Sequence, residues 1–226
     1  MKSVWVALLL SLKIAFWATF INLVIGVLLG YVLARKNIWG RALIDTVLTL
    51  PMVMPPTVLG YYLLVIMGKN GFIGQWLQQA FDINLIFTWQ GAVVAATIVS
   101  LPLVFKPARA AFEALDIQLE QAGRVLGISN LAIFFRITLP LAWRGILAGV
   151  LLAFARSLGE FGATLMVAGS IPGQTQTLSI AVYEAVQSGD DQLANRLVLI
   201  ISAVCIVLLL MISKLLSGKK PVLNLK

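Results

Sequence analysis

Long apolar stretches alternate with short polar connections along most of this chain. Five stretches are long enough to cross a bilayer, whose hydrocarbon core of about 30 Å needs about 20 helical residues. They comprise residues 14–34, 46–67, 85–105, 139–167 and 197–212. Lipid offers no partner to a backbone polar group, so such stretches must be helical. The pattern predicts an all-α membrane protein with five transmembrane helices in a single domain, residues 1–226. Residues 4–12 are expected to form a separate interfacial segment before the first span.

The composition supports a membrane protein and argues against an enzyme. Hydrophobic residues make up 60% of the chain and charged residues 12%, whereas soluble domains have about 45–50% and about 25%. Histidine is absent, and the single Cys205 lies in an apolar run, where packing is the expected role. The sequence contains neither a phosphate-binding loop of the G-x4-G-K-[ST] type nor a nucleophile with its base. We therefore expect no catalysis, no metal site and no cofactor in this chain.

The basic residues mark one side of the membrane. Twelve fall in connections on one side of the five spans and four on the other, which is the positive-inside pattern. The twelve are Arg35, Lys36, Arg41, Lys106, Arg109, Arg124, Arg136, Arg144, Lys214, Lys219, Lys220 and Lys226, and the four are Lys2, Lys13, Lys69 and Arg196. The N-terminus is then outside, while the C-terminus and the loop of residues 106–138 are cytoplasmic. The net charge of +8 thus reflects topology and no nucleic-acid partner.

The cytoplasmic loop contains an ordered, helix-prone segment. Residues 120–126 favour a short helix, and Gly127 ends it by adopting a left-handed conformation. Residues 131–135 add an apolar stripe at helical spacing, and Pro140 fits the first turn of the fourth span. The prediction is a helix on the membrane surface that docks a partner, with anchoring to lipid headgroups as the alternative. The candidate docking residues are Glu120, Gln121, Ala122, Gly123, Arg124, Gly127, Phe134, Phe135, Ile137, Leu139 and Pro140.

The fourth span contains two charges at the depth of the membrane. Arg156 lies twelve residues after Arg144, or about 18 Å along a helix, and Glu160 follows on the same face. A charge at that depth is costly and must face protein or a wet cavity. Arg156, Gly159 and Glu160 are candidates for an anion path or gate. A structural ion pair between helices is the alternative.

The second span contains Pro51, Pro55 and Pro56, which must bend or break its helix. A break at membrane depth survives only inside protein or at a cavity. Pro55, Pro56 and the hydroxyl of Thr57 are therefore candidate path residues, with a simple packing kink as the alternative. On the outer side, residues 75–79 and 179–187 are each expected to form a short amphipathic helix.

Several of these stretches resemble one known family. The spacing of Gly127, nine residues and then Ile137-Thr138-Leu139-Pro140 resembles the cytoplasmic coupling loop of ABC importer permeases. Residues 55–64, 71–74 and 153–163 are similar to the permease subunits of bacterial molybdate ABC importers. The last stretch is shared with sulfate permeases, and the whole resemblance covers residues 8–216. The family opening E-A-A-x3-G falls on Gln121, Ala122 and Gly123, with the acid one place earlier at Glu120, whose partner is left open.

The resemblance implies a fold, partners and a mechanism. The fold would be that of a type I ABC importer permease in the bacterial inner membrane. The chain would form a homodimer, with ATP and Mg bound by two separate ATP-binding subunits and an oxyanion-binding protein docking outside. The transport of molybdate or tungstate by alternating access is the implied function. A sulfate/thiosulfate-type permease and an ion-coupled secondary transporter are the alternatives.

Overall fold

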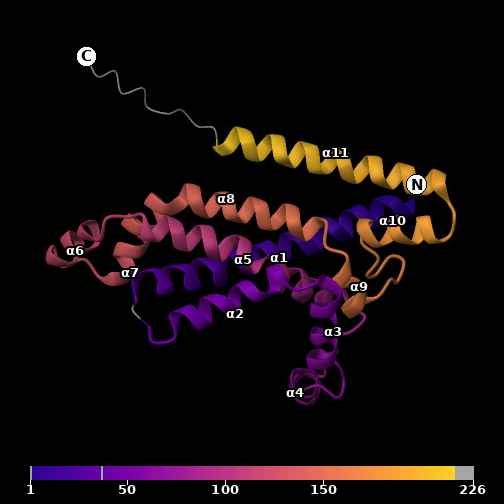
Figure 1. Cartoon of the computed structure of the whole chain (residues 1–226), viewed down its shortest axis with the longest axis horizontal. Helices are drawn as coiled ribbons and strands as arrows, with labels where there is room; N and C mark the ends of the chain where they lie inside the picture. The colour runs from indigo at the N-terminus through magenta and orange to yellow at the C-terminus, as the bar shows by residue number, and fades with distance from the viewer. Residues whose placement is uncertain (1, 37, 217–226) are drawn as a thin grey trace.

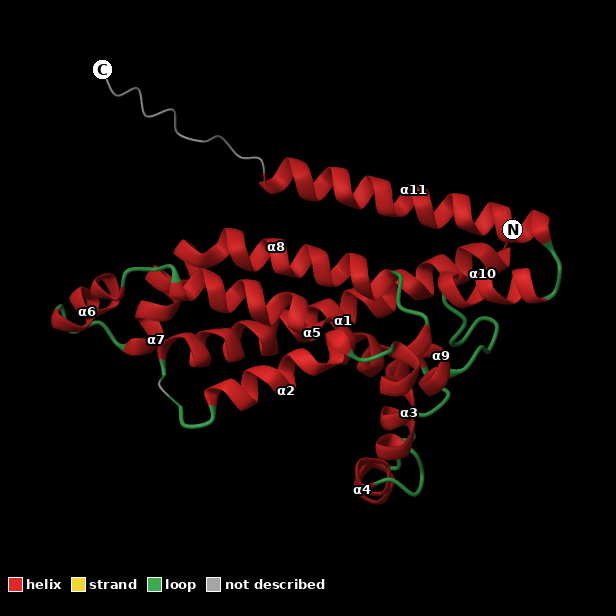
Figure 2. Cartoon of the chain, viewed as in Figure 1, coloured by secondary structure: helices red, strands yellow, loops and turns green. Residues whose placement is uncertain are grey.

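Helices account for the regular secondary structure of residues 2–36 and 38–216, the parts that this computed structural model describes (Figure 2). Four helical segments there are long and apolar enough to cross a membrane: Val4–Arg35, Trp89–Glu113, Asn130–Leu158 and Asp191–Met211. A fifth is counted if the bent pair Arg41–Val53 and Pro56–Met67 forms one span. The prediction of an all-helical membrane protein is confirmed. Lys219, Lys220 and Lys226, which entered the topology count, lie outside the described residues.

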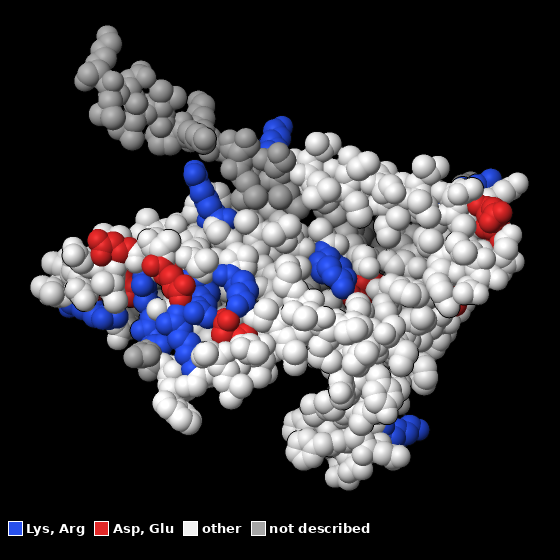
Figure 3. Space-filling model, viewed as in Figure 1, with Lys and Arg blue, Asp and Glu red and all other residues white. Residues whose placement is uncertain are grey.

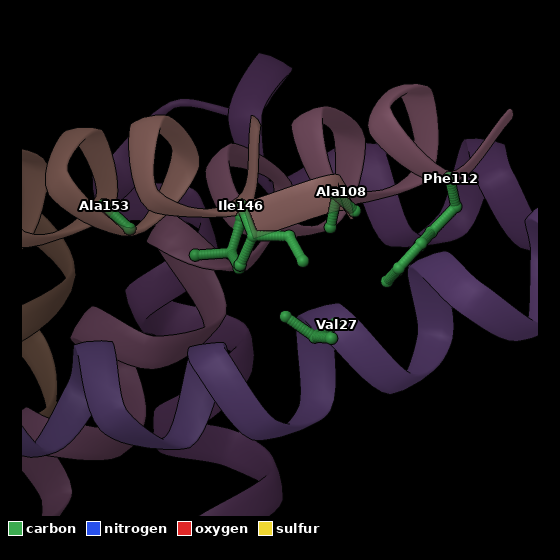
Figure 4. Close-up of a cluster of buried hydrophobic side chains, with 7 residues drawn as sticks. Val27, Ala108, Phe112, Ile146 and Ala153 are labelled. Atoms are coloured by element: carbon green, nitrogen blue, oxygen red, sulfur yellow. The ribbon is translucent and has the colours of Figure 1, made fainter. Parts of the chain in front are cut away.

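Three helices form the centre of the molecule: α1 (Lys2–Arg35), α5 (Trp89–Glu113) and α8 (Leu139–Leu158). Figure 1 shows them running alongside one another, and Figure 4 shows side chains from all three meeting. Small residues allow this close approach. A Cβ at Gly149 would lie 2.7 Å from the carbonyl oxygen of Leu103, so α8 could not approach α5 as closely with a larger residue. The buried cluster comprises Val27, Val104, Ala108, Phe112, Ala142, Ile146 and Ala153.

A buried polar chain links the same three helices. The side-chain amide of Asn22 donates to the Ser100 hydroxyl at 2.8 Å, and that oxygen lies 3.0 Å from the Ser157 hydroxyl oxygen. All three side chains are buried. Hydrogen bonds between membrane helices stabilise the bundle by about 0.6 kcal/mol each on average. The network also fixes the register of α1, α5 and α8, because each bond requires one rotational setting.

The second span is broken where the prolines predict. Helix α2 (Arg41–Val53) and helix α3 (Pro56–Met67) meet at an angle of 113°. Met54 between them is extended, and Pro56 occupies the first turn of α3, where its missing N–H costs nothing. Helix α3 then packs tightly on α9 (Gly162–Ala168). A Cβ at Gly60 would lie 2.7 Å from the Cβ of Met166.

The fourth span differs from the predicted continuous helix over residues 139–167. Helix α7 (Asn130–Ile133), a π-helical turn η1 (Phe134–Thr138) and α8 lead into the membrane in succession. The helix then breaks at residues 159–161 before α9 begins. The Glu160 carboxylate accepts a hydrogen bond from the Ala163 backbone N–H at 3.0 Å, so it caps the new helix. The apolar stripe of residues 131–135 thus belongs to this descending span and to no separate surface helix.

The connection between the third and fourth spans is also shorter than the predicted residues 106–138. Helix α5 continues to Glu113, and α6 (Ile117–Val125) follows after a short turn. The predicted separate segment of residues 4–12 is wrong, because α1 is one unbroken helix from Lys2 to Arg35. Lys13 lies within it with its Nζ 3.5 Å from the centre of the Trp89 ring.

The two short helices predicted over residues 75–79 and 179–187 are present as α4 (Phe72–Phe81) and α10 (Leu178–Gln187). Helix α4 follows α3, and together they project from the central bundle (Figure 1). Helix α10 leads into α11 (Asp191–Leu216), which lies along one side of the molecule with little of its surface covered. Much of α11 is therefore open to lipid or to another protein.

Candidate functional site

The segment between α5 and α8 folds locally as its turn residues predict. Asp116 caps α6, because its carboxylate accepts the Gln118 N–H at 2.9 Å. Gly127 ends this helix with a φ of 74°, a left-handed conformation that glycine adopts without strain. The Ile128 N–H then donates to the Gly123 carbonyl oxygen at 3.0 Å, which closes the turn. The predicted short helix ending at Gly127 is present.

Glu120 anchors α6 to the bundle. Its carboxylate accepts a hydrogen bond from Arg35 Nε at 2.9 Å and another from the Thr138 hydroxyl at 3.1 Å. The side chain of Glu120 is 3% exposed and that of Arg35 is 12% exposed. The pair therefore joins the end of α1 to α6, and Thr138 adds the end of η1. The partner of Glu120, which the sequence left open, is an internal arginine.

Gly123 lies at the other contact of α6. A Cβ there would stand 3.1 Å from Cγ1 of Ile133, a tight contact to which the Ile133 side chain would have to yield by a few tenths of an ångström. The departure from the family's alanine therefore has a packing reason. Among the predicted docking residues, Phe134 also faces inward, with its ring centroid 4.8 Å from that of Tyr31. Ile137 and Leu139 are half-buried, and Pro140 lies exposed in the first turn of α8.

The opposite face of this segment is apolar and exposed. Val125 is 87% exposed, Leu126 77% and Leu131 73%. Phe135 adds a ring that is 58% exposed, and the polar side chains of Gln121 and Arg124 flank them. Large apolar side chains at such exposure make this segment a candidate surface for contact with another protein. We call Val125, Leu126, Leu131 and Phe135 the docking face.

A ladder of charges joins α2 to α5 near the same end of the molecule. Asp45 contacts Lys106 Nζ at 2.6 Å and Arg109 Nη1 at 2.5 Å. Arg109 Nε also contacts Glu113 at 2.9 Å, and Glu113 in turn pairs with Arg41. No residue of the described helix α2 is buried, so these charges hold it where packing does not. Figure 3 shows basic and acidic side chains gathered at this end.

Arg156 and Glu160 lie beside the break in the second span. Arg156 Nη1 is 2.6 Å from Glu160 Oε2. The Glu160 side chain is 1% exposed, whereas that of Arg156 is 37% exposed. The guanidinium borders a cavity of about 250 Å³ whose other lining residues are Pro51, Met52, Met54, Pro56, Val99 and Leu103. The structure therefore brings Arg156 and Pro56 together, as a path through the protein requires.

Other predicted path residues lie outside this cavity. Pro55, Thr57 and Gly159 are exposed but do not line it. Sequence reasoning missed the charge ladder and the Asn22 chain. Asn22 within the apolar residues 14–34 was the signal for the latter, because a polar side chain inside a membrane span needs a partner. Within the described residues there is no group of three His, Cys, Asp or Glu side chains that fits a metal ion.

Comparison with known proteins identifies relatives along most of the chain. Residues 26–218 match the family described as the binding-protein-dependent transport system inner membrane component. The chain is 47% identical over 207 residues to the molybdenum transport system permease protein ModB of Escherichia coli K12, covering 91% of this chain and 90% of that protein. It is 37% identical over 205 residues to the sulfate transport system permease protein CysT of Salmonella typhimurium LT2, covering 91% of this chain and 74% of that protein.

Solved structures share the fold at low sequence identity. The inward-facing MetNI methionine ABC transporter matches with a TM-score of 0.73 at 15% identity, covering 96% of each chain. A bacterial ABC transporter involved in alginate import matches with a TM-score of 0.71 at 15% identity, covering 96% of this chain and 80% of that one. At these identities the likeness establishes the fold alone.

The Glu120 anchor leads to a test of local stability. Removing one partner of a buried ion pair costs about 3–5 kcal/mol. We expect Glu120→Ala to accelerate amide hydrogen exchange in residues 114–129 while leaving the exchange of α1 and α5 unchanged. Glu113→Ala is the matched control. Glu113 also forms ion pairs, but its side chain is 40% exposed, whereas that of Glu120 is nearly buried. Equal effects of the two substitutions, or none for Glu120→Ala, would contradict the anchoring role.

Proposed function

This chain belongs to the family of inner membrane components of binding-protein-dependent transport systems, and we propose that it is the permease subunit of an ATP-driven molybdate importer. Permeases of this family are multi-pass inner membrane proteins, and ATP is bound by their partner subunits. The substrate assignment rests on the 47% identity to a molybdenum permease, which covers 91% of this chain. Tungstate carries the same charge and shape, so the proposal includes it.

The proposed mechanism uses both ends of the described structure. With the basic end in the cytoplasm, the docking face meets the ATP-binding subunit, and the Glu120–Arg35 pair passes its movement to α1. Two copies of the chain would enclose a path along their two-fold axis. The broken α2–α3 pair and Arg156 would line it, where a positive charge attracts an oxyanion. The binding protein would deliver the oxyanion at the outer end, near α4 and α10.

The charge ladder fits alternating access. Helix α2 buries no side chain within the described structure, so it can shift against α5 without opening an apolar core. Its ion pairs with Lys106 and Arg109 are partly exposed, and pairs of that kind contribute about 0–1 kcal/mol each. The close packing of α1, α5 and α8 resists change far more strongly. The proposed movement is therefore a swing of α2 relative to a rigid bundle, about the break that separates it from the packed helix α3.

A secondary transporter is less consistent with the observed contacts. Ion coupling usually needs an intramembrane acidic group free to take up a cation. Glu160 is paired with Arg156 at 2.6 Å and also caps α9 through the Ala163 N–H. A sulfate permease is the closer alternative, because the chain is 37% identical to CysT over 91% of its length.

The proposal is tested by ATP hydrolysis in proteoliposomes. They would contain this chain, its ATP-binding subunit and its binding protein, titrated with molybdate, tungstate and sulfate. We expect molybdate or tungstate to stimulate hydrolysis and sulfate to leave it at the basal rate. Stimulation by sulfate alone would keep the transport class and overturn the substrate. Absence of a complex, with no stimulation by any oxyanion, would reject the importer.

The docking face is tested by Leu126→Asp. Burying a leucine side chain contributes about 1.5–3 kcal/mol, so its loss should reduce copurification of the ATP-binding subunit by about tenfold or more. Val186→Asp is the control, since Val186 is similarly exposed at 60% but lies in α10, toward the other end of the molecule. Both variants should insert into the membrane and elute during purification as the native chain does. Normal copurification of Leu126→Asp would place the docking surface elsewhere.

A double substitution separates the two roles of Arg156. Arg156→Gln alone leaves the buried Glu160 without its cation and should reduce thermal stability. Adding Glu160→Gln removes that unpaired charge and keeps an oxygen that accepts the Ala163 N–H. If Arg156 serves the path, the double variant recovers stability but transports the oxyanion at a rate at least tenfold below native. Recovery of both properties would make the pair purely structural.

A further inference from the structure

A second cavity lies beside the docking segment and has a different chemistry. It encloses about 560 Å³ and is lined by Tyr31, Val32, Arg35, Lys36, Arg124 and Asn130. These residues come from the end of α1, from α6 and from the start of α7. Figure 1 shows α6 and α7 together at one end of the molecule, and the Arg35–Glu120 contact brings the end of α1 to them. The cavity is thus the space between the first span and the docking segment.

The charges around this cavity are unbalanced. Three cations line it, and the nearest carboxylate among the described ion pairs is Glu120, which leaves a local charge of about +2. Arg35 Nε takes that carboxylate at 2.9 Å, whereas Arg124 Nη2 stands 3.8 Å away, beyond hydrogen-bond distance. Lys36 takes part in none of the ion pairs found among the described residues. The cavity therefore attracts an anion.

The cavity also lies at a defined depth. Helix α1 has 34 residues, so its length of about 51 Å exceeds the apolar core of about 30 Å by roughly 20 Å. Its last turn carries Tyr31 and Arg35, and in the proposed orientation this basic end lies in the headgroup layer, where tyrosine and basic residues concentrate. The side chains of Tyr31 and Val32 line the same space, so the ligand must carry an apolar portion as well as a charge.

From these observations we propose that the cavity binds the phosphate headgroup of an anionic lipid from the cytoplasmic leaflet. Lys36 and Arg124 contact the phosphate, and the acyl chains follow α1 into the membrane. Basic pockets at the cytoplasmic ends of spans are suited to such headgroups. The bound lipid joins α1 to the docking segment and adds to the Glu120 anchor. The leaflet assignment rests on the proposed orientation, with the basic end in the cytoplasm.

The test measures lipid retention by the complex of this chain with its ATP-binding subunit. The complex is purified from vesicles of phosphatidylcholine with a minor fraction of phosphatidylglycerol, and bound lipid is counted by native mass spectrometry. The variant carries Lys36→Gln and Arg124→Gln and keeps Arg35, so Glu120 retains its buried partner. Two cations at about 1 kcal/mol each predict a loss of phosphatidylglycerol affinity of about 30-fold. Arg136→Gln is the matched control, an exposed arginine on η1 outside the cavity.

Each other outcome overturns the proposal. Unchanged phosphatidylglycerol retention in the double variant, or an equal loss in Arg136→Gln, would mean that the cavity does not hold the headgroup. Displacement of the lipid by millimolar inorganic phosphate or molybdate would indicate a site for a free oxyanion. The isolated chain could also bind the lipid and lose it when the ATP-binding subunit is added. That result would mean that the subunit, and no lipid, occupies the cavity in the complex. The comparison of lipid retention between the variants uses no transported substrate, so its failure and that of the molybdate assay are distinguishable.

Discussion

The close contact of α1, α5 and α8 is the constraint on which the other parts depend. Apolar side chains gain little by leaving lipid for protein, so membrane helices associate through tight packing and hydrogen bonds. Gly149 against Leu103 and the Asn22–Ser100–Ser157 chain supply both. Both contacts are lost if one helix slides along another, because Gly149 meets Leu103 at only one axial position and the hydrogen bonds require one rotation of each helix. The bundle therefore moves as a unit, and movement is confined to what is attached to it.

The attached parts are held by contacts of different strength, in keeping with different roles. Helix α6 is held through Glu120, a nearly buried acid with two hydrogen-bond donors, so it follows α1 closely. Helix α2 is held through partly exposed ion pairs around Asp45, which water can replace when they separate. In the proposed mechanism, a force on the docking segment would reach the bundle through Glu120, whereas α2, which buries no side chain, can swing relative to the bundle. Strong coupling at one end and loose attachment at the path are what alternating access needs.

Hydrophobic periodicity predicted the helical class and the places of the spans, because span length is set by the bilayer and little else. The prolines predicted the break before Pro56, because the backbone N–H groups that proline lacks are lost from the helix at the position of the proline itself. The break at residues 159–161 was not predicted, because Gly159 and Gly162 flank it but glycine is also common inside continuous membrane helices. The Glu160 carboxylate that accepts the Ala163 N–H becomes visible only in the fold. The Asp45 ladder and the Arg35–Glu120 pair join residues 61 to 85 positions apart, and no local pattern specifies which distant charges will meet.

The position of the acid in the docking segment shows how one residue of register changes a role. Successive helical residues are rotated by about 100°, so Glu120 and Gln121 face different directions on α6. The family pattern places its acid where this chain has the exposed Gln121, whereas Glu120 is 2% exposed and faces α1. Glu120 Oε1 accepts hydrogen bonds from Arg35 and Thr138, and Oε2 lies 3.8 Å from Arg124 Nη2, so this acid is engaged within the chain. The docking that we propose then depends on the exposed apolar residues around Leu126, while the buried Glu120 holds their helix against α1.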